Sequence, residues 1–222
     1  MEACLAVLAK FPRPGRVKSR LAADIGAKHA ANIQKGMLLD ILDRFCRIQD
    51  LTVAIVFPFD EKPQPFLDLC RHARIPTDRV LLLQGVSDMN ADIVYAYQTL
   101  LAQFRKIVVM GADIPHYTET QLRELLSVLD EVDIAYHPNP DDGCCPHGLR
   151  HFGDLWTGND SRDPGYILRW TERANAQDLS YRALSTIFDV DRLDDLVHLE
   201  NEFADYCPHT ICAIRALHAQ TR

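Results

Sequence analysis

Residues 4–21 read Cys4-Leu-Ala-Val-Leu-Ala-Lys10-Phe-Pro-Arg-Pro-Gly15-Arg-Val-Lys18-Ser-Arg20-Leu21. The short apolar run is typical of a buried parallel strand, and the Pro-Gly pair ends it before a basic segment that opens a helical pattern. Free backbone N–H groups and the positive end of the helix dipole would face the turn, where Lys10, Lys18 and Arg20 can neutralise phosphate oxygens. The stretch therefore predicts the first strand of an α/β sheet with an anion cradle at its end, and favours a nucleotide as the anion.

The cradle lacks the glycine patterns of the best-known phosphate-binding loops. Neither the three-glycine dinucleotide pattern nor a Gly-Lys-Ser/Thr loop occurs in residues 9–21. The alternative interpretation is that its five cations form an ordinary solvated face. Other parts of the chain must therefore support the nucleotide hypothesis.

Composition limits the classes of partner. The chain has 222 residues, a formal net charge of -7 and 47% hydrophobic residues, which is ample for one α/β domain. An acidic chain with a local basic cluster favours a small anionic ligand over nucleic acid or a membrane surface. Without a membrane-spanning stretch or signal-peptide core we expect a cytoplasmic protein, and the sequence does not indicate its oligomeric state.

The seven cysteines do not predict a disulfide framework. Several of them lie within apolar patterns and are expected to be small buried hydrophobic residues. Cys-Pro-His occurs at residues 145–147 and 207–209, but one residue between ligands is not the usual zinc spacing. The sequence therefore does not favour a zinc site.

Strand and helix patterns alternate along most of the chain. Expected strands cover 4–10, 51–57, 79–85, 106–111, 132–136 and 182–188; expected helices cover 18–48, 61–74, 89–104, 118–130, 164–176, 194 onward and 210–220. The first five strands predict a mostly parallel, Rossmann-like sheet with helices on both faces. We expect one domain over 1–222, with a nucleotide-binding half at 1–137 and an acceptor-side half at 138–222.

Ligands of such sheets lie beyond the carboxyl ends of the strands. This rule selects Gly85 and Asp88 after the third strand and Asp113 after the fourth. It also selects Asp141, Asp142 and Gly143, which open an irregular, Pro- and Gly-rich stretch at 138–164 that is long for a connection. We expect this stretch to meet the acceptor.

The segment Gly111-Ala-Asp113-Ile-Pro115 places a carboxylate at the end of an apolar strand. Mg²⁺ or Mn²⁺ is commonly bound by one or two carboxylates plus substrate phosphates, so Asp191 or Asp189 could complete a site. A solvated turn aspartate is the alternative for Asp113. Asp142, His116 and His147 are candidate general bases, although lone histidines are more often structural.

Four segments together resemble a known family: residues 9–21, residues 111–115, Asp141-Asp-Gly143, and Asp189-Val-Asp191-Arg-Leu-Asp-Asp-Leu196. They are similar to the bacterial 2-phospho-L-lactate guanylyltransferase-like (CofC-like) group, whose members are usually labelled glycosyltransferases. The resemblance implies one GT-A-like domain of the nucleotide-diphospho-sugar transferase superfamily.

The same resemblance implies roles for individual residues. The turn that contains Ala9, Lys10, Pro14, Gly15, Lys18 and Arg20 would hold the nucleotide diphosphate. Asp113 would bind the metal, with Asp191 as the better second ligand and Asp189 in reserve.

One segment departs from the family pattern. Similar proteins tend to have Asp-Gly-Gly-Tyr where this chain has Asp142-Gly143-Cys144-Cys145, followed by Pro146, which cannot donate within a strand. Three hypotheses follow: a glycosyltransferase that uses a nucleotide-diphospho-sugar, a nucleotidylyltransferase that joins a nucleoside triphosphate to a small phosphorylated acceptor, and a nucleotide-binding protein that has lost catalysis.

Overall fold

A computed structural model describes residues 2–141, 143–159 and 165–220. The strands are β1 Ala3–Leu8, β2 Leu51–Phe57, β3 Val80–Gln84, β4 Lys106–Gly111, β5 Ile134–Pro138, β6 Cys144–Leu149 and β7 Tyr181–Ala183. The helices are α1 Ser19–Ile25, α2 Ala27–Phe45, α3 Gln64–His72, α4 Met89–Leu101, α5 Glu119–Val128, α6 Tyr166–Ala176, α7 Leu193–Glu202 and α8 Pro208–Gln220, with short 3₁₀ turns at Thr77–Arg79 and Ala204–Tyr206.

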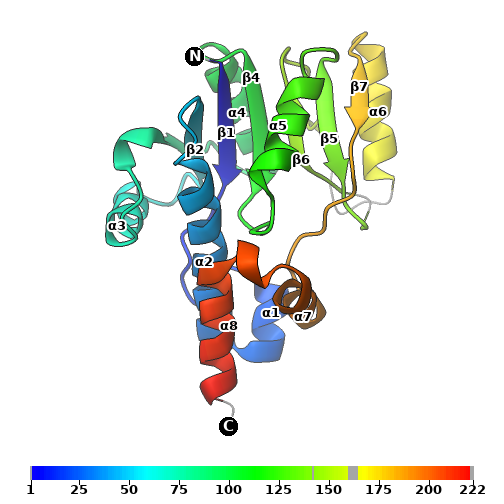
Figure 1. Cartoon of the computed structure of the whole chain (residues 1–222). Helices are drawn as coiled ribbons and strands as arrows, with labels where there is room; N and C mark the ends of the chain where they lie inside the picture. The colour runs from blue at the N-terminus through cyan, green and yellow to red at the C-terminus, as the bar shows by residue number, and fades with distance from the viewer. Residues whose placement is uncertain (1, 142, 160–164, 221–222) are drawn as a thin grey trace.

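The described strands form one sheet in the order β3-β2-β1-β4-β6-β5-β7 (Figure 1). All pairings are parallel except those of β6, which runs antiparallel to both β4 and β5. The carboxyl ends of the six other strands therefore share one edge of the sheet. This outcome confirms the predicted α/β fold with a mostly parallel sheet.

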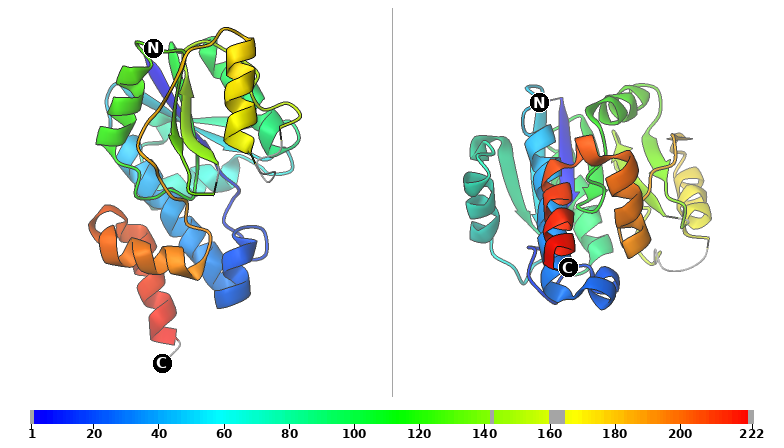
Figure 2. Two further views of the ribbon diagram at one scale, coloured as in Figure 1. Left: turned by 90° about the vertical axis from the view of Figure 1, so that its right-hand side faces the viewer. Right: turned by 60° about the horizontal axis from the view of Figure 1, so that its bottom comes forward.

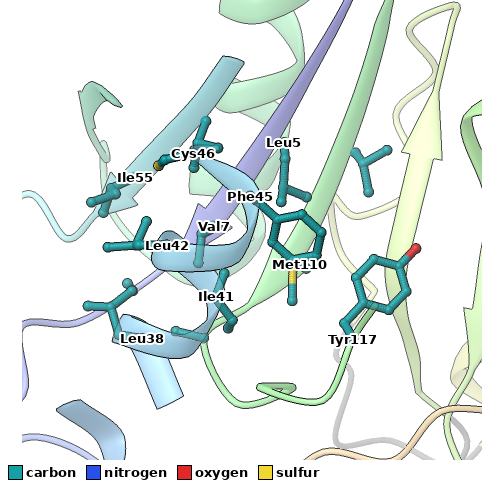
Figure 3. Packing of buried hydrophobic residues seen from close by; sticks show 14 of the residues in the cluster. Leu5, Val7, Leu38, Ile41, Leu42, Phe45, Cys46, Ile55, Met110 and Tyr117 are labelled. Atoms are coloured by element: carbon teal, nitrogen blue, oxygen red, sulfur yellow. The ribbon is translucent and has the colours of Figure 1, made fainter. Parts of the chain in front are cut away.

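Alternate residues of each central strand point to opposite faces and so divide the core in two. Leu5 and Val7 of β1 pack with Met110 of β4 against α2, α3 and α5 on one face, as Figure 3 shows for the part beside α2. Cys4 and Ala6 face α4 and α6 on the other. Helices thus cover both faces, as the alternating sequence pattern predicts.

A third cluster of buried side chains lies beyond the carboxyl edge of the sheet. It joins α1 and the first half of α2 to α7 and α8, with Leu21, Ile33 and Leu199 fully enclosed. Figures 1 and 2 show α2 running past the sheet edge with α8 alongside it. This helical unit forms one wall beside the strand ends.

Three expected elements differ in detail. The helix expected over 18–48 is two helices, because Gly26 adopts a positive φ of 85° between them. The strand expected over 182–188 is only three residues long, and β6 lies within the stretch expected to be irregular. In the described part of the chain no helix combines the length and the apolar character needed to cross a membrane.

Candidate active site

The cradle loop leaves β1 at the sheet edge and is anchored by a buried carboxylate. Ala9 donates to the Val56 carbonyl at 2.9 Å, and the Phe11 N–H donates to Glu61 Oε2 at 2.8 Å. Gly15 has a φ of 77°, which a glycine adopts without strain. The side chains of Lys10 and Pro14 are exposed, so this loop offers a cationic, solvent-facing surface.

The helix that follows the loop is short. α1 has seven residues, and Lys18, which precedes it, is itself in the left-handed region with φ 48° and ψ 55°. The predicted contribution of a long helix dipole to anion binding is therefore wrong, because the helix that follows the cradle has only seven residues. Any anion held there depends chiefly on the side-chain cations.

Asp113 is positioned by a loop that helix α2 holds in place. The Gln34 amide donates to the Ala112 carbonyl at 2.8 Å, and Arg44 donates to the carbonyls of Pro115 and Tyr117 at 2.6 and 2.9 Å. A Cβ on Gly111 would lie 2.2 Å from Asp113 Oδ1, so any larger residue at this position would displace the Asp113 carboxylate. The predicted strand-end position of Asp113 is therefore built by several contacts.

The chain between β7 and α7 brings two more carboxylates to the same place. Ile187 donates to the Pro138 carbonyl at 3.0 Å and Val190 to the Asp113 carbonyl at 2.9 Å. These bonds lay residues 187–190 along the strand ends. Asp113, Asp189 and Asp191 each offer a carboxylate oxygen, and the three oxygens lie within 4.8 Å of one another.

Two cations of the cradle pair with this acidic cluster (Asp113, Asp189 and Asp191). Lys18 Nζ lies 3.1 Å from Asp113 Oδ2 and 2.7 Å from Asp191 Oδ1, and Arg20 Nη1 lies 2.6 Å from Asp191 Oδ2. Asp195 Oδ2 accepts the backbone N–H of Asp191 at 2.9 Å. Residues far apart in the sequence thus meet in one polar site.

The electrostatics of the cluster follow from burial and charge. Burial disfavours the Lys18 ammonium, but Asp113 and Asp191 outweigh this effect and raise the pKa of Lys18. Burial also acts on Asp191, yet Lys18 and Arg20 lower its pKa overall. For Asp189, burial and then the charges of Asp113, Asp191 and Asp141 raise the pKa to about 6.

The donor set fits a hard divalent cation. Mg²⁺ and Mn²⁺ prefer oxygen ligands, and three carboxylates from two loops can supply them while leaving positions for phosphate oxygens or water. Among the described residues, this is the one group of three or more acidic, histidine or cysteine side chains close enough to hold a metal. The two Cys-Pro-His segments do not form such a group there.

The remaining nucleotide-site candidates lie in the loop after β3. Gly85 is buried, and a Cβ there would come within 2.3 Å of Asp92 Oδ1, which accepts the Val86 N–H at 2.6 Å. Asp88 caps α4 by accepting the Ala91 N–H at 3.1 Å. The structure thus gives Gly85 and Asp88 local structural roles, and their contact with a nucleotide stays a prediction.

The acceptor-side candidates are dispersed. Asp141 is exposed after β5, near enough to affect Asp189, and Gly143 accepts the Asn139 N–H at 2.8 Å to close the turn. Asp142 lies outside the described residues. These positions are compatible with the predicted acceptor side without testing it.

The two candidate histidines are both buried among aromatic rings. His147 Nδ1 lies 2.7 Å from the Tyr97 hydroxyl in the core, and burial lowers the pKa of His147 to about 3. His116 stacks on Phe188 at 4.2 Å, and burial, then Arg44, lower the pKa of His116 to about 4. The structure does not bring either ring into the ion-pair network of the acidic cluster.

Two residues shape the site through contacts that the sequence does not predict. Glu61 anchors the cradle loop, and Cys145 Sγ accepts the Gly111 N–H at 3.2 Å beside Asp113. Glu61 belongs to no recognisable motif, and the sequence singles out Cys145 only as a departure from the family pattern. Each accepts a hydrogen bond from a backbone N–H that only the fold brings near. Asp195, in contrast, lies in the segment 189–196 that carries the family resemblance.

Comparisons with known proteins support the fold. The family model described as "Uncharacterized protein conserved in bacteria (DUF2064)" matches residues 49–158, just under half of the chain. This match includes Asp113 but excludes Lys18, Asp189 and Asp191. No curated protein sequence matches the chain.

Solved structures match over nearly the whole chain. A protein from Desulfovibrio desulfuricans G20, provisionally assigned as a nucleotide-diphospho-sugar transferase, is 24% identical, with a TM-score of 0.84 over 99% of this chain and 98% of that one. A cytidylyltransferase from Leptospira borgpetersenii serovar Hardjo-bovis is 12% identical, with a TM-score of 0.57 over 100% and 95% of the two chains.

A third match contains manganese. Rv0371c from Mycobacterium tuberculosis H37Rv, solved as a manganese complex, is 17% identical, with a TM-score of 0.53 over 91% of this chain and 100% of that one. At these identities the likeness concerns the fold. The chain therefore has the nucleotide-diphospho-sugar transferase fold, with an acidic cluster at the carboxyl edge of its sheet.

Proposed function

We propose that this protein is a metal-dependent transferase that acts on a nucleotide donor, with glycosyl transfer from a nucleotide-diphospho-sugar as its first candidate reaction. The observation that carries the proposal is the convergence of Asp113, Asp189 and Asp191 with Lys18 and Arg20 at the ligand-binding edge of a parallel sheet. Such a site can bind a divalent cation and a diphosphate side by side.

Each group has a proposed part in the reaction. Asp113 and Asp191, with Asp189, would hold Mg²⁺ or Mn²⁺, which when bound would offset negative charge on the leaving diphosphate. Lys10, Gly15 and Arg20 would bind and orient the phosphates. Residues 1–137 would form the nucleotide side and 138–222 the acceptor side of the site.

The second candidate is nucleotidyl transfer to a small phosphorylated acceptor. It is favoured by the fold likeness to a cytidylyltransferase and to a CMP-2-keto-3-deoxy-manno-octonic acid synthetase solved with CTP. The resemblance to the CofC-like group points the same way. Both reactions use the same donor phosphates and metal, and differ in the bond that breaks.

Donor binding provides the first test. Nucleoside triphosphates and nucleotide sugars are screened by thermal shift with Mg²⁺, Mn²⁺ or EDTA, because a ligand that binds only the native state raises the melting temperature. We expect a metal-dependent shift that Asp113→Asn removes. Asp43→Asn, at a partly exposed position of α2 outside the acidic cluster, should keep the shift. The absence of a shift with every donor and metal would contradict the proposal.

Product analysis then distinguishes the reactions. Slow hydrolysis of a bound donor needs no acceptor, so the protein is incubated with each stabilising donor and the released phosphates are identified. A nucleoside diphosphate indicates glycosyl transfer, whereas pyrophosphate released from a triphosphate indicates nucleotidyl transfer. Binding without turnover, even with phosphorylated acceptors, would support a non-catalytic binding protein.

A further inference from the structure

We infer that the Lys18 ammonium is a built-in counter-ion of the acidic cluster, and that a divalent cation must displace it to bind. This inference rests on the proposed function, since it concerns the same carboxylates. It adds a property that the transferase proposal does not require: the protein should bind free metal weakly until Lys18 moves away.

The position of the Lys18 side chain carries the first step. Its Nζ bridges two carboxylates, 3.1 Å from Asp113 Oδ2 and 2.7 Å from Asp191 Oδ1. The side chain is only 6% exposed, so water screens this charge poorly. A cation already lies between the two residues that are the best candidates for metal ligands.

The backbone directs Lys18 into this position. Lys18 adopts a left-handed conformation that few residues other than glycine, asparagine or aspartate adopt, and the preceding Val17 is buried. Arg20, two residues on, turns to Asp191 Oδ2 from the solvent side, at 57% side-chain exposure. The loop therefore places one enclosed and one open cation on the same carboxylate.

A charge count shows why a metal would still be attracted. Three carboxylates face two cations, and among the described residues Asp189 forms no ion pair. Among the described residues, Asp113 Oδ1 and the Asp189 carboxylate take part in no ion pair, so a divalent cation can approach them first. Completing the site with Asp191 then brings the cation to oxygens that Lys18 and Arg20 now contact. The metal and the ammonium would then lie within a few ångströms of each other. Because both are positively charged, they repel and compete for the same carboxylates.

The lysine side chain can respond to this competition. Its four-carbon stem is flexible, and the cradle loop that contains it is the proposed phosphate site. An ammonium displaced from the carboxylates could pair with donor phosphates instead. Metal binding would free the Lys18 ammonium for the donor phosphates, and bound phosphates would stabilise the displaced ammonium. Metal and donor would therefore each increase the affinity for the other.

Manganese binding without any nucleotide tests the inference. Free Mn²⁺ is measured by electron paramagnetic resonance during titration of the wild type, Lys18→Met, Lys18→Arg and Lys10→Met. We expect Lys18→Met to bind Mn²⁺ at least tenfold more tightly than the wild type, and Lys18→Arg to stay as weak as the wild type. Lys10→Met removes the same charge from the same loop without a contact to the cluster, and should change the affinity less than threefold.

A second measurement avoids dependence on one variant. Lys18→Gln, checked by circular dichroism, repeats the charge removal with a side chain that can still donate a hydrogen bond. In the wild type, the ¹⁵N ammonium resonance that Lys18→Arg lacks should shift when Mg²⁺ is added.

The outcomes separate this inference from the proposed function. Tighter Mn²⁺ binding by the charge-free Lys18 variants supports it. Metal binding that is equal in the wild type and those variants, or an ammonium resonance unchanged when Mg²⁺ binds, overturns it while leaving the transferase proposal intact. Failure of every variant to bind Mn²⁺, with or without a nucleotide, overturns both.

Discussion

At the scale of single residues, the two carboxylate oxygens of Asp191 pair with different cations. Asp191 Oδ1 accepts a hydrogen bond from Lys18 and Oδ2 accepts one from Arg20. The backbone N–H of Asp191 donates to Asp195. Paired, partly buried ions of this kind are costly to disturb singly, because the partner is left without compensation. The arrangement fixes the Asp191 side chain even before a metal is considered.

The buried His147 predicts a specific dependence of stability on pH. Its pKa is lowered to about 3 by burial, whereas an unfolded histidine titrates near 6.5. Between these values the unfolded state binds the proton, so stability present above pH 6.5 is lost as the pH falls. From pH 7 to pH 5 this residue alone should remove about 2 kcal/mol from the free energy of unfolding.

We therefore expect His147→Gln to lose less stability than the wild type between pH 7 and pH 5, whatever its stability at pH 7. Urea unfolding at both pH values measures this difference. His72→Gln, on the exposed surface of α3, is the matched control and should keep the wild-type loss. An unchanged loss in His147→Gln would mean that another buried group dominates acid unfolding.

At the scale of elements, α2 connects the sheet to the helical unit. Gly36 allows the start of α8 to approach closely, since a Cβ there would lie 2.8 Å from the His209 carbonyl oxygen and the Thr210 Cα. Asp40, one turn later, accepts the backbone N–H groups of His209 and Thr210, both at 2.9 Å. α2 thus supplies both the space and the cap for α8.

Gly36→Ala should consequently destabilise the protein. Helix propensity alone favours alanine by about 1 kcal/mol, but the clash is with backbone atoms and overpacking of this kind costs about 1–3 kcal/mol. We expect a net loss of up to about 2 kcal/mol in urea unfolding. Asn32→Ala, on the exposed side of the same helix, should be neutral or slightly stabilising, and a stabilised Gly36→Ala would contradict the packing interpretation.

The β6 strand shows where local patterns fail at this scale. Residues 144–149 read Cys-Cys-Pro-His-Gly-Leu and lack the alternation and β-branched residues of an expected strand. They become a strand because β4 and β5 leave a gap that an antiparallel segment fills, with Val109 and Tyr136 both opposite His147. The same pairing places the imidazole of His147 in the core.

At the scale of the whole molecule, the acidic cluster ties the sheet to the helical unit. The contacts from Lys18 span 95 and 173 residues of sequence, and Asp191 lies two residues before the start of α7. In Figure 2 the chain descends from β7 across the strand ends toward α7. A metal held by Asp113 and Asp191 would therefore link the sheet to the helical unit.

This arrangement predicts a localised effect of metal on hydrogen exchange. At Mg²⁺ concentrations well above its dissociation constant, amides of residues 187–203 should exchange more slowly, because local detachment of that segment would break the metal site. α3, on the far part of the sheet, should be unchanged and serves as an internal control. Equal slowing throughout the chain, or none in 187–203, would contradict a metal shared between the two parts.

The sequence by itself determined the architecture and the place of the cradle cations in it. Apolar runs separated by helical periods specify a parallel sheet, and the parallel arrangement places Asp113 and the cradle cations at one edge. The sheet architecture and the place of the cradle both follow from local sequence patterns, each of which extends over one strand or helix.

Only the tertiary structure decided which polar residues meet. The meeting of Asp189 and Asp191 with Asp113, the insertion of β6 and the burial of His116 and His147 depend on contacts between segments far apart in the sequence. Such contacts arise from filling space and satisfying buried polar groups, which no local pattern records. The position of Lys18 between two carboxylates is likewise decided only by the tertiary structure.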